Sequence, residues 1–161
     1  MERWPTLRYE DWKETRDTLH RWTQIVGKIR LSKSPWMNHS WHATFYVTEQ
    51  GLTTSLIDDP SGPFTIDFDF IHHVLRVSSS TGRTTVLPLG SESVASFYYR
   101  CLQSLGQHGV QARIVARPNE VMDATPFKED FAHGTYDPEA VSYTHLRAHE
   151  TKANLVCRLL L

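Results

Sequence analysis

Two aspartates separated by a single residue are the first candidates for chemistry in this sequence. Asp67 and Asp69 fall within the stretch 64–70, where apolar and polar residues alternate as they do along a β-strand. On a strand, both carboxyl groups project from one face about 7 Å apart, a separation that paired catalytic carboxylates also use. The alternative is the solvated face of a half-buried sheet with Arg76 or Arg83 as cross-strand partners, and the alternation favours it.

Two histidines, His39 and His42, have a spacing that can hold a metal ion. Such a pair binds a metal only if both side chains face the same way and a third ligand is supplied. No cysteine or acidic residue lies close to them in the sequence. We therefore predict no metal site and keep both histidines as candidates for proton transfer.

The segment 20–42 is rich in tryptophan and in cationic side chains. This combination suits a pocket that stacks a planar or sugar-like ligand and neutralises an anion. The candidate ligand-binding residues are His20, Trp22, Gln24, Lys28, Arg30 and Trp36. Two alternatives remain open: the polar row at positions 20, 24 and 28 is solvated helix surface, and the tryptophans belong to the core.

Motifs that define enzyme classes are absent from the sequence. It contains no glycine-rich phosphate loop, nucleophile elbow, zinc-protease motif or kinase signature. We therefore predict no cofactor, and the sequence leaves open whether the protein is an enzyme.

The elements that must position these residues begin with a helix over residues 9–30. Its apolar side chains fall on one side of a helical wheel, and Ser32 to Pro35 end it. Gly27 inside this helix indicates a close packing contact. A second helix is predicted over residues 91–105, with Ser91 or Ser93 as N-cap and Gly106 or Gly109 at its end.

Between the helices the sequence predicts a β-rich region. Strands are expected over 44–48, 52–57, 64–70, 74–77 and 84–87, joined by short turns as an antiparallel meander. Residues Phe64, Ile66, Phe68 and Phe70 should be buried with Trp22 or Ile29 and Phe97. The predicted fold class is therefore α+β, with both helices packed on one face of the sheet.

Beyond the second helix, a closing strand is expected over 110–115. The segment 117–138 loses all periodicity and is punctuated by prolines. A structureless stretch of this length is unusual inside a compact domain, so we expect it to lie against a further part of the protein.

Composition narrows the class of protein. The chain has 161 residues, with 17 basic and 18 acidic side chains, which gives no basic excess for nucleic acid. The N-terminus has no apolar signal, no run is long enough for a membrane helix, and Cys101 has no partner outside the last residues. We expect a cytoplasmic protein with no nucleic-acid or membrane partner, and the sequence does not predict its oligomeric state.

Ordered motifs over residues 1–140 resemble DUF5996, a large bacterial family of unknown function. The matching stretches are Trp4-Pro5, Tyr9–Lys13, Thr18–Leu31, Pro35–His39, Tyr46–Thr48, Gly51–Ser55, Ile66–Ile71, Ser93–Tyr98 and Tyr136–Ala140. Members of this family are roughly twice as long as this chain. The resemblance implies that residues 1–140 are the N-terminal part of a single domain, a truncated fragment whose segment 117–140 leads towards a missing C-terminal half. It supplies no catalytic residues.

The last residues, 141–161, read as a translated sequencing-library adapter. Val141–Glu150 and Leu155–Leu161 each match the translation of a constant adapter segment, with a barcode-sized gap between them. The alternative is a genuine C-terminal helix, because the leucines and Val156 have helical spacing. We expect residues 141–161 to make little contact with residues 1–140 and a chain ended at 140 to fold poorly alone.

Two functions follow as hypotheses. The first is a small polar or anionic ligand-binding or enzymatic domain with a pocket lined by Trp, His and Arg side chains. The second is a non-catalytic structural or protein-interaction domain. Convergence of Arg30, His42 and Asp69 in one cleft would favour the first, and scattering of these residues would favour the second.

Overall fold

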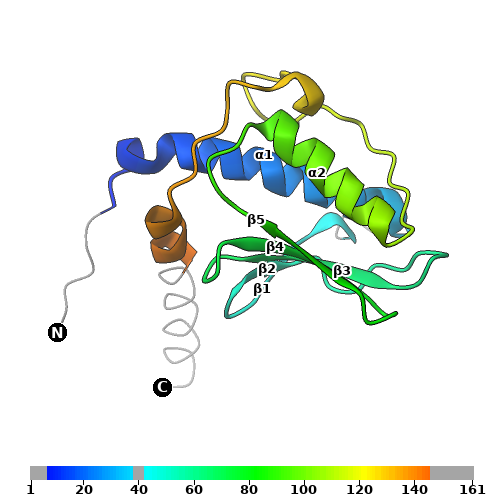
Figure 1. The fold of residues 1–161 in the computed structure, drawn as a ribbon. Helices are drawn as coiled ribbons and strands as arrows, with labels where there is room; N and C mark the ends of the chain where they lie inside the picture. Colours follow the sequence, from blue (N-terminus) through cyan, green and yellow to red (C-terminus); the bar gives the residue numbers. More distant parts are fainter. Residues whose placement is uncertain (1–6, 38–41, 146–161) are drawn as a thin grey trace.

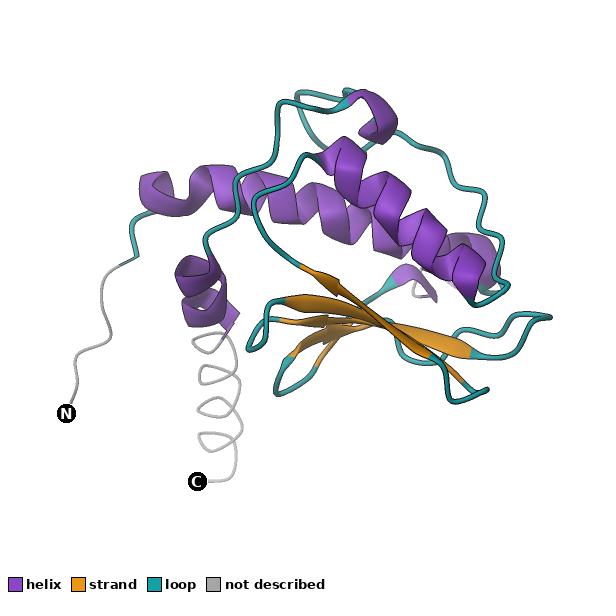
Figure 2. Cartoon of the chain, viewed as in Figure 1, coloured by secondary structure: helices purple, strands orange, loops and turns teal. Residues whose placement is uncertain are grey.

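Two helices cover one face of a five-stranded sheet. The computed structural model describes residues 7–37 and 42–145. In Figure 1, α1 (Tyr9–Lys33) and α2 (Val94–Gln107) form one layer and the sheet forms the other. Figure 2 shows that, within the described part of the chain, the opposite face of the sheet carries no helix. The predicted α+β class and the packing of both helices on one face are confirmed.

Helix α1 is three residues longer than predicted. It continues to Lys33 and ends where Ser34, just before Pro35, takes an extended conformation. Its buried apolar residues are Trp22, Ile25, Val26 and Ile29, as the periodicity indicates. At Gly27 the ring of Phe45 lies 3.6 Å from the position that a Cβ would occupy, which is an ordinary van der Waals contact, and closer packing than this is not found there among the described residues.

The sheet is an antiparallel meander. Its strands are β1 (Tyr46–Val47), β2 (Gly51–Thr53), β3 (Phe64–Asp69), β4 (Val74–Ser79) and β5 (Thr84–Pro88), and each pairs with the next along the chain. The second strand is shorter than predicted, because Ser55 adopts a left-handed conformation with φ of 55° and the chain leaves the ladder. Beyond β2, Ile57 pairs with Phe64 of β3 in an isolated antiparallel β-bridge.

The predicted core residues are buried together. Phe64, Ile66, Phe68 and Phe70 are at most 4% exposed. The indole of Trp22 stacks on Phe97 with ring centroids 4.7 Å apart, and Phe97 in turn stacks near Phe68. The two layers are therefore joined by aromatic contacts between α1, α2 and β3.

Helix α2 begins three residues later and ends two residues later than the predicted range 91–105. The side chain of Ser93 accepts a hydrogen bond from the backbone N–H of Ser96, which satisfies one free donor of the first turn. The helix runs through Gly106 and ends at Gln107, and Gly109 follows with φ of 78°. Of the alternatives, Ser93 and Gly109 are the residues that the chain uses.

The prediction of a strand over residues 110–115 is wrong. These residues pair with no strand of the described sheet, although Ala112 and Ile114 pack partly against the core while their neighbours are exposed. Alternation of apolar and polar residues indicates which side chains are buried. An extended segment that packs beside a helix shows the same alternation as a β-strand, although it forms no backbone pairing.

The segment 117–138 lies against the helices of this same chain. It contains a short 3-10 helix, η2 (Phe127–Glu129), and the side chains of Phe127 and Tyr136 are part of the core. Residue Asn119 contacts α1 near Gln24, whereas Asp137 contacts Thr15. The segment therefore runs back along α1, and its cover comes from within the described residues.

The expectation that residues from 141 onward lack packing partners is wrong for residues 141–145. Helical structure that begins at residue 138 continues through 145, and Val141 is 3% exposed within the core cluster. The hydroxyl of Ser142 donates to the carbonyl of Phe70 at 2.8 Å, and the ring of His145 meets Phe70 edge-on. The helical residues 138–145 therefore place these side chains against the end of β3 and the β3–β4 turn. The remainder, 146–161, lies outside the described residues.

Neither α1 nor any other helix in residues 7–37 and 42–145 is long and apolar enough to cross a bilayer.

Candidate functional site

The paired aspartates have different surroundings. Asp67 is half-buried, accepts a hydrogen bond from Thr65 at 3.0 Å and lies opposite Arg76 in the sheet register. Asp69 is 3% exposed and forms an ion pair with Arg76 at 3.3 Å. The predicted cross-strand partner is therefore Arg76, whereas Arg83 donates to the carbonyl of Gln107.

Asp69 shapes the β3–β4 turn. Its Oδ1 accepts the backbone N–H groups of Ile71 and His72 at 3.0 and 2.9 Å, and its Oδ2 lies 2.8 Å from the His72 ring. Burial alone would raise the pKa of Asp69, but the hydrogen bonds from His72 and Ile71 outweigh it and hold the pKa below its ordinary value. This geometry is that of a turn-forming carboxylate. A small pocket of about 210 Å³ lies beside both aspartates and Arg76.

The histidine pair is only half described. His39 lies outside the described residues. His42 is buried, and its Nδ1 accepts the backbone N–H of Met37 at 3.2 Å. The ring of Trp36 packs edge-on against His42, although Trp36 itself is 72% exposed. The nitrogen Nδ1 of His42 is thus engaged within the loop that follows α1.

Two of the predicted ligand-binding residues, Gln24 and Lys28, form hydrogen bonds with Asn119 in the segment after α2. The Gln24 side-chain amide donates to the carbonyl of Asn119 at 2.9 Å and accepts its N–H at 2.7 Å. The ammonium group of Lys28 lies 3.2 Å from the Asn119 side chain, and partial burial lowers the pKa of Lys28. A third, Trp22, is a core residue. These side chains position the segment and the core.

The three residues chosen as a test of convergence have separate surroundings. Arg30 contacts Ser55 and the Tyr46 ring, His42 contacts Met37 and Trp36, and Asp69 contacts the β3–β4 turn. No contact within the described residues joins Arg30, His42 and Asp69. The three side chains therefore share no contact cluster in the described structure.

A groove of the described surface lies between the N-terminal half of α1 and the segment 120–133. Its volume is about 880 Å³. Its wall on α1 is formed by Tyr9, Trp12, Lys13, Arg16, Asp17, Leu19, His20, Arg21 and Thr23. The rest of its lining is formed by Glu120, Val121, Met122, Asp123, His133 and Thr144. Of the predicted site residues, His20 lines this groove. A second hollow of about 320 Å³ shares Lys13, Asp17 and His133 with it.

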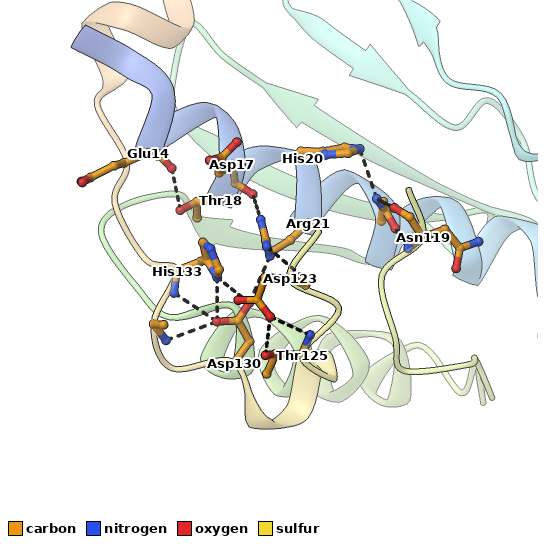
Figure 3. Close-up of polar contacts among 12 residues, drawn as sticks. Glu14, Asp17, Thr18, His20, Arg21, Asn119, Asp123, Thr125, Asp130 and His133 are labelled. Atoms are coloured by element: carbon orange, nitrogen blue, oxygen red, sulfur yellow. Dashed lines mark hydrogen bonds and ion pairs between the residues drawn. The ribbon is translucent and has the colours of Figure 1, made fainter. Parts of the chain in front are cut away.

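A buried ion pair supports one end of the groove. Arg21 and Asp130 are 5% and 1% exposed, and Nε of Arg21 lies 3.2 Å from Oδ2 of Asp130, although the N–H is not aligned for a hydrogen bond. The Arg21 guanidinium also donates to the carbonyls of Asp17 and Asp123 at 3.0 and 3.2 Å. Figure 3 shows these contacts converging between α1 and the loop.

His133 completes this arrangement. Its Nδ1 lies 3.0 Å from both carboxylate oxygens of Asp130, and its side chain is 24% exposed. Because Asp130 is paired with an arginine that is always charged, its carboxylate accepts and Nδ1 of His133 donates. Nε2 of the neutral ring then keeps its lone pair. Among the described residues, no group forms a hydrogen bond with this Nε2.

The loop that carries His133 is fixed to the start of α2. The N–H of Val94 donates to the carbonyl of His133 at 2.9 Å, and the N–H of Ala95 donates to the carbonyl of Asp130 at 3.0 Å. Asp130 also accepts the backbone N–H groups of Ala132 and His133. A Cβ at Gly134 would lie 3.1 Å from the Glu92 carbonyl, so this close approach suits glycine. The imidazole is therefore held by a rigid element.

Sequence reasoning missed Arg21, Asp130 and His133. The signal was the spacing of Asp130 and His133, three residues apart within a segment of turn-forming residues, which permits an aspartate to accept from the following backbone and ring. Arg21 gave no signal, because an arginine on a helix is usually exposed. In the described part of the chain, no three acidic, His or Cys side chains are grouped as metal ligands.

The fold defines an α+β domain in which two helices cover one face of an antiparallel meander and a groove borders the first helix. The sequence pattern of DUF5996, described as a family of unknown function, matches residues 4–156. The chain therefore belongs to this family. No curated protein and no solved structure matches it significantly.

Proposed function

We propose that this protein binds a small amphipathic ligand in the groove between α1 and residues 120–133. The observation that carries the proposal is the position of His133, whose Nδ1 is held by the buried Asp130 while the ring lines both hollows. A histidine oriented by a buried carboxylate presents a hydrogen-bond acceptor of fixed direction.

The walls of the groove indicate the chemistry of the ligand. Trp12, Leu19 and Met122 supply apolar surface, and a planar or aliphatic body packs against such walls. The lining carries three cations, Lys13, Arg16 and Arg21, and three carboxylates, Asp17, Glu120 and Asp123. This balance favours a ligand without a large net charge. The lone pair of His133 Nε2 calls for a hydroxyl or amine donor on the ligand.

The same geometry supports proton transfer. A ligand hydroxyl or amine that donates to Nε2 of His133 is placed to give up its proton to that nitrogen. Asp130 and Arg21 remain charged in this step, and Asp130 stabilises the imidazolium that forms. We propose His133 as the proton acceptor of the groove, with Asp130 as its positioning residue.

Aromatic fragments test this function. Phenol and benzylamine carry a planar body and a donor, and toluene is the matched control without a donor. In an amide-resolved NMR titration, we expect phenol or benzylamine to shift the signals of Trp12, Met122 and His133, with affinity about tenfold above that of toluene, because toluene would cover the Nε2 acceptor of His133 without supplying a donor.

The variant His133→Ala should weaken phenol binding about tenfold, because the phenol hydroxyl loses its hydrogen-bond acceptor. The matched control His72→Ala removes an exposed histidine of the β3–β4 turn and should leave the affinity unchanged. Equal affinities of phenol and toluene, or shifts confined to the sheet, would contradict the proposal.

A further inference from the structure

Arg30, near the C-terminal end of α1, is a buried cation without an anionic partner in the described structure. The side chain is 7% exposed, and its Nε and Nη1 atoms are enclosed and form no hydrogen bond with any described residue. Nη2 makes one long contact of 3.4 Å to the hydroxyl of Ser55. The guanidinium carries five N–H donors and remains charged, so most of its hydrogen-bonding capacity is unused.

The neighbouring charges do not compensate for this burial. Lys33, on the next turn, forms an ion pair with Asp59 at 2.6 Å, which occupies that carboxylate. The C-terminal end of the helix dipole favours a cation here, but it provides no acceptor for Nε or Nη1. A buried charge that lacks both a partner and hydrogen bonds is unfavourable, and proteins usually keep one only where a ligand or another charge completes it.

Two side chains contact the guanidinium of Arg30. The ring of Tyr46 lies over Arg30, with 5.3 Å between the guanidinium carbon and the ring centroid, and Tyr46 is 51% exposed. Ser55 is partly exposed and is held in a left-handed conformation with φ of 55°. Its hydroxyl accepts from Arg30 and retains a hydrogen to donate. The guanidinium thus lies just beneath the surface between an aromatic ring and a hydroxyl.

We propose that Arg30 and Ser55, with Tyr46 beside them, form a binding site for an oxyanion, the carboxylate or phosphate group of a small molecule. The guanidinium supplies charge and donors of the geometry that oxyanions accept, and Ser55 supplies a neutral donor. Arg30 follows His20 by ten residues, about 15 Å along the helix axis, so this site is distinct from the groove. It does not depend on the function proposed for the groove.

Titrations with inorganic phosphate and with acetate, each at constant ionic strength against chloride, test the site and distinguish its two sources. We expect one of the two anions to bind the full chain saturably and to shift the NMR signals of Tyr46 and Ser55. Arg30→Met should weaken this binding about tenfold or more, since it removes a charged hydrogen-bond donor. The matched control Arg113→Met, which removes an exposed arginine after α2, should bind as the wild type does.

A structural role for Arg30 makes a different prediction. If the site serves an anion, Arg30→Met should melt no lower than the wild type in chloride, because an apolar isostere replaces an uncompensated charge. A large loss of melting temperature in chloride, or no saturable binding of phosphate or acetate to the wild type, overturns the proposal. Ser55→Ala is a second test in a chain that keeps the guanidinium: weaker anion binding supports the site, and unchanged binding overturns it.

Discussion

At the scale of single residues, carboxylates that look alike in the sequence have acquired different roles. Asp67 and Asp69 lie two residues apart on the same face of β3. Only Asp69 accepts hydrogen bonds from the turn that follows the strand. Asp130 gave no periodic signal, but it is the carboxylate that pairs with a buried arginine and orients a histidine. The environment of each carboxylate, set by distant residues, decides its role.

Asp69 should stabilise the fold in a pH-dependent way. We expect Asp69→Asn to lower the free energy of unfolding by about 1.5–3 kcal/mol near neutral pH, since it weakens charge-assisted hydrogen bonds in a buried turn. The pKa of Asp69 is depressed in the folded protein, so its contribution is fully present above the ordinary aspartate pKa, about 3.9. The contribution declines as the pH falls from there through the lower folded pKa.

Urea unfolding of the wild type and Asp69→Asn between neutral and acidic pH measures this difference. Asp67→Asn is the matched control, because Asp67 is half-buried and accepts from one side chain only among the described contacts. A stability difference for Asp69→Asn that stays constant down to the lowest pH would contradict the role assigned to the ionised carboxylate.

At the scale of elements, periodicity predicted the helices and the meander well, because burial of one face imposes a period on the sequence. The strand expected over 110–115 failed because its alternation arises from packing without backbone pairing. The packing of segment 117–138 against α1 could not be predicted from periodicity either. Its contacts to α1 are single polar pairs, such as Gln24 with Asn119, and these leave no periodic trace.

Two glycines should respond in opposite ways to substitution by alanine. At Gly27 a Cβ would meet Phe45 at 3.6 Å, an ordinary contact, so Gly27→Ala should stabilise the protein by about 0.5–1 kcal/mol through helix propensity. At Gly51 a Cβ would lie 1.9 Å from the carbonyl oxygen of Phe68, so Gly51→Ala should destabilise by about 1–3 kcal/mol or more. Denaturant unfolding of both variants checks the pair, and a destabilised Gly27→Ala would show that the Phe45 contact is tighter than described.

At the scale of the whole molecule, the described residues bury a core that joins α1, α2, the sheet and the segment 117–145. Val141 and Tyr136 belong to that core, so it extends beyond residue 140. The sequence predicted the inner face of the sheet correctly. The contribution of residues 141–145 could not be predicted, because the adapter-like reading separated them from the helix that begins at residue 138.

A comparison of two shortened chains tests that contribution. A chain ended after His145 should be more stable than one ended after Ala140 by at least about 1.5–3 kcal/mol, the value of burying one large aliphatic side chain such as Val141. Both are compared by thermal unfolding and size-exclusion chromatography. Identical melting of the two chains would mean that residues 141–145 add nothing to the fold.

The account of function depends on His133, and ¹⁵N NMR of its imidazole, recorded at about pH 8 where an ordinary histidine is neutral, tests it most directly. We predict a proton on Nδ1, held by Asp130, and an Nε2 signal that moves when phenol is added and stays in place when toluene is added. A proton on Nε2 in the free protein, or an Nε2 signal indifferent to saturating phenol, would contradict the proposed groove site.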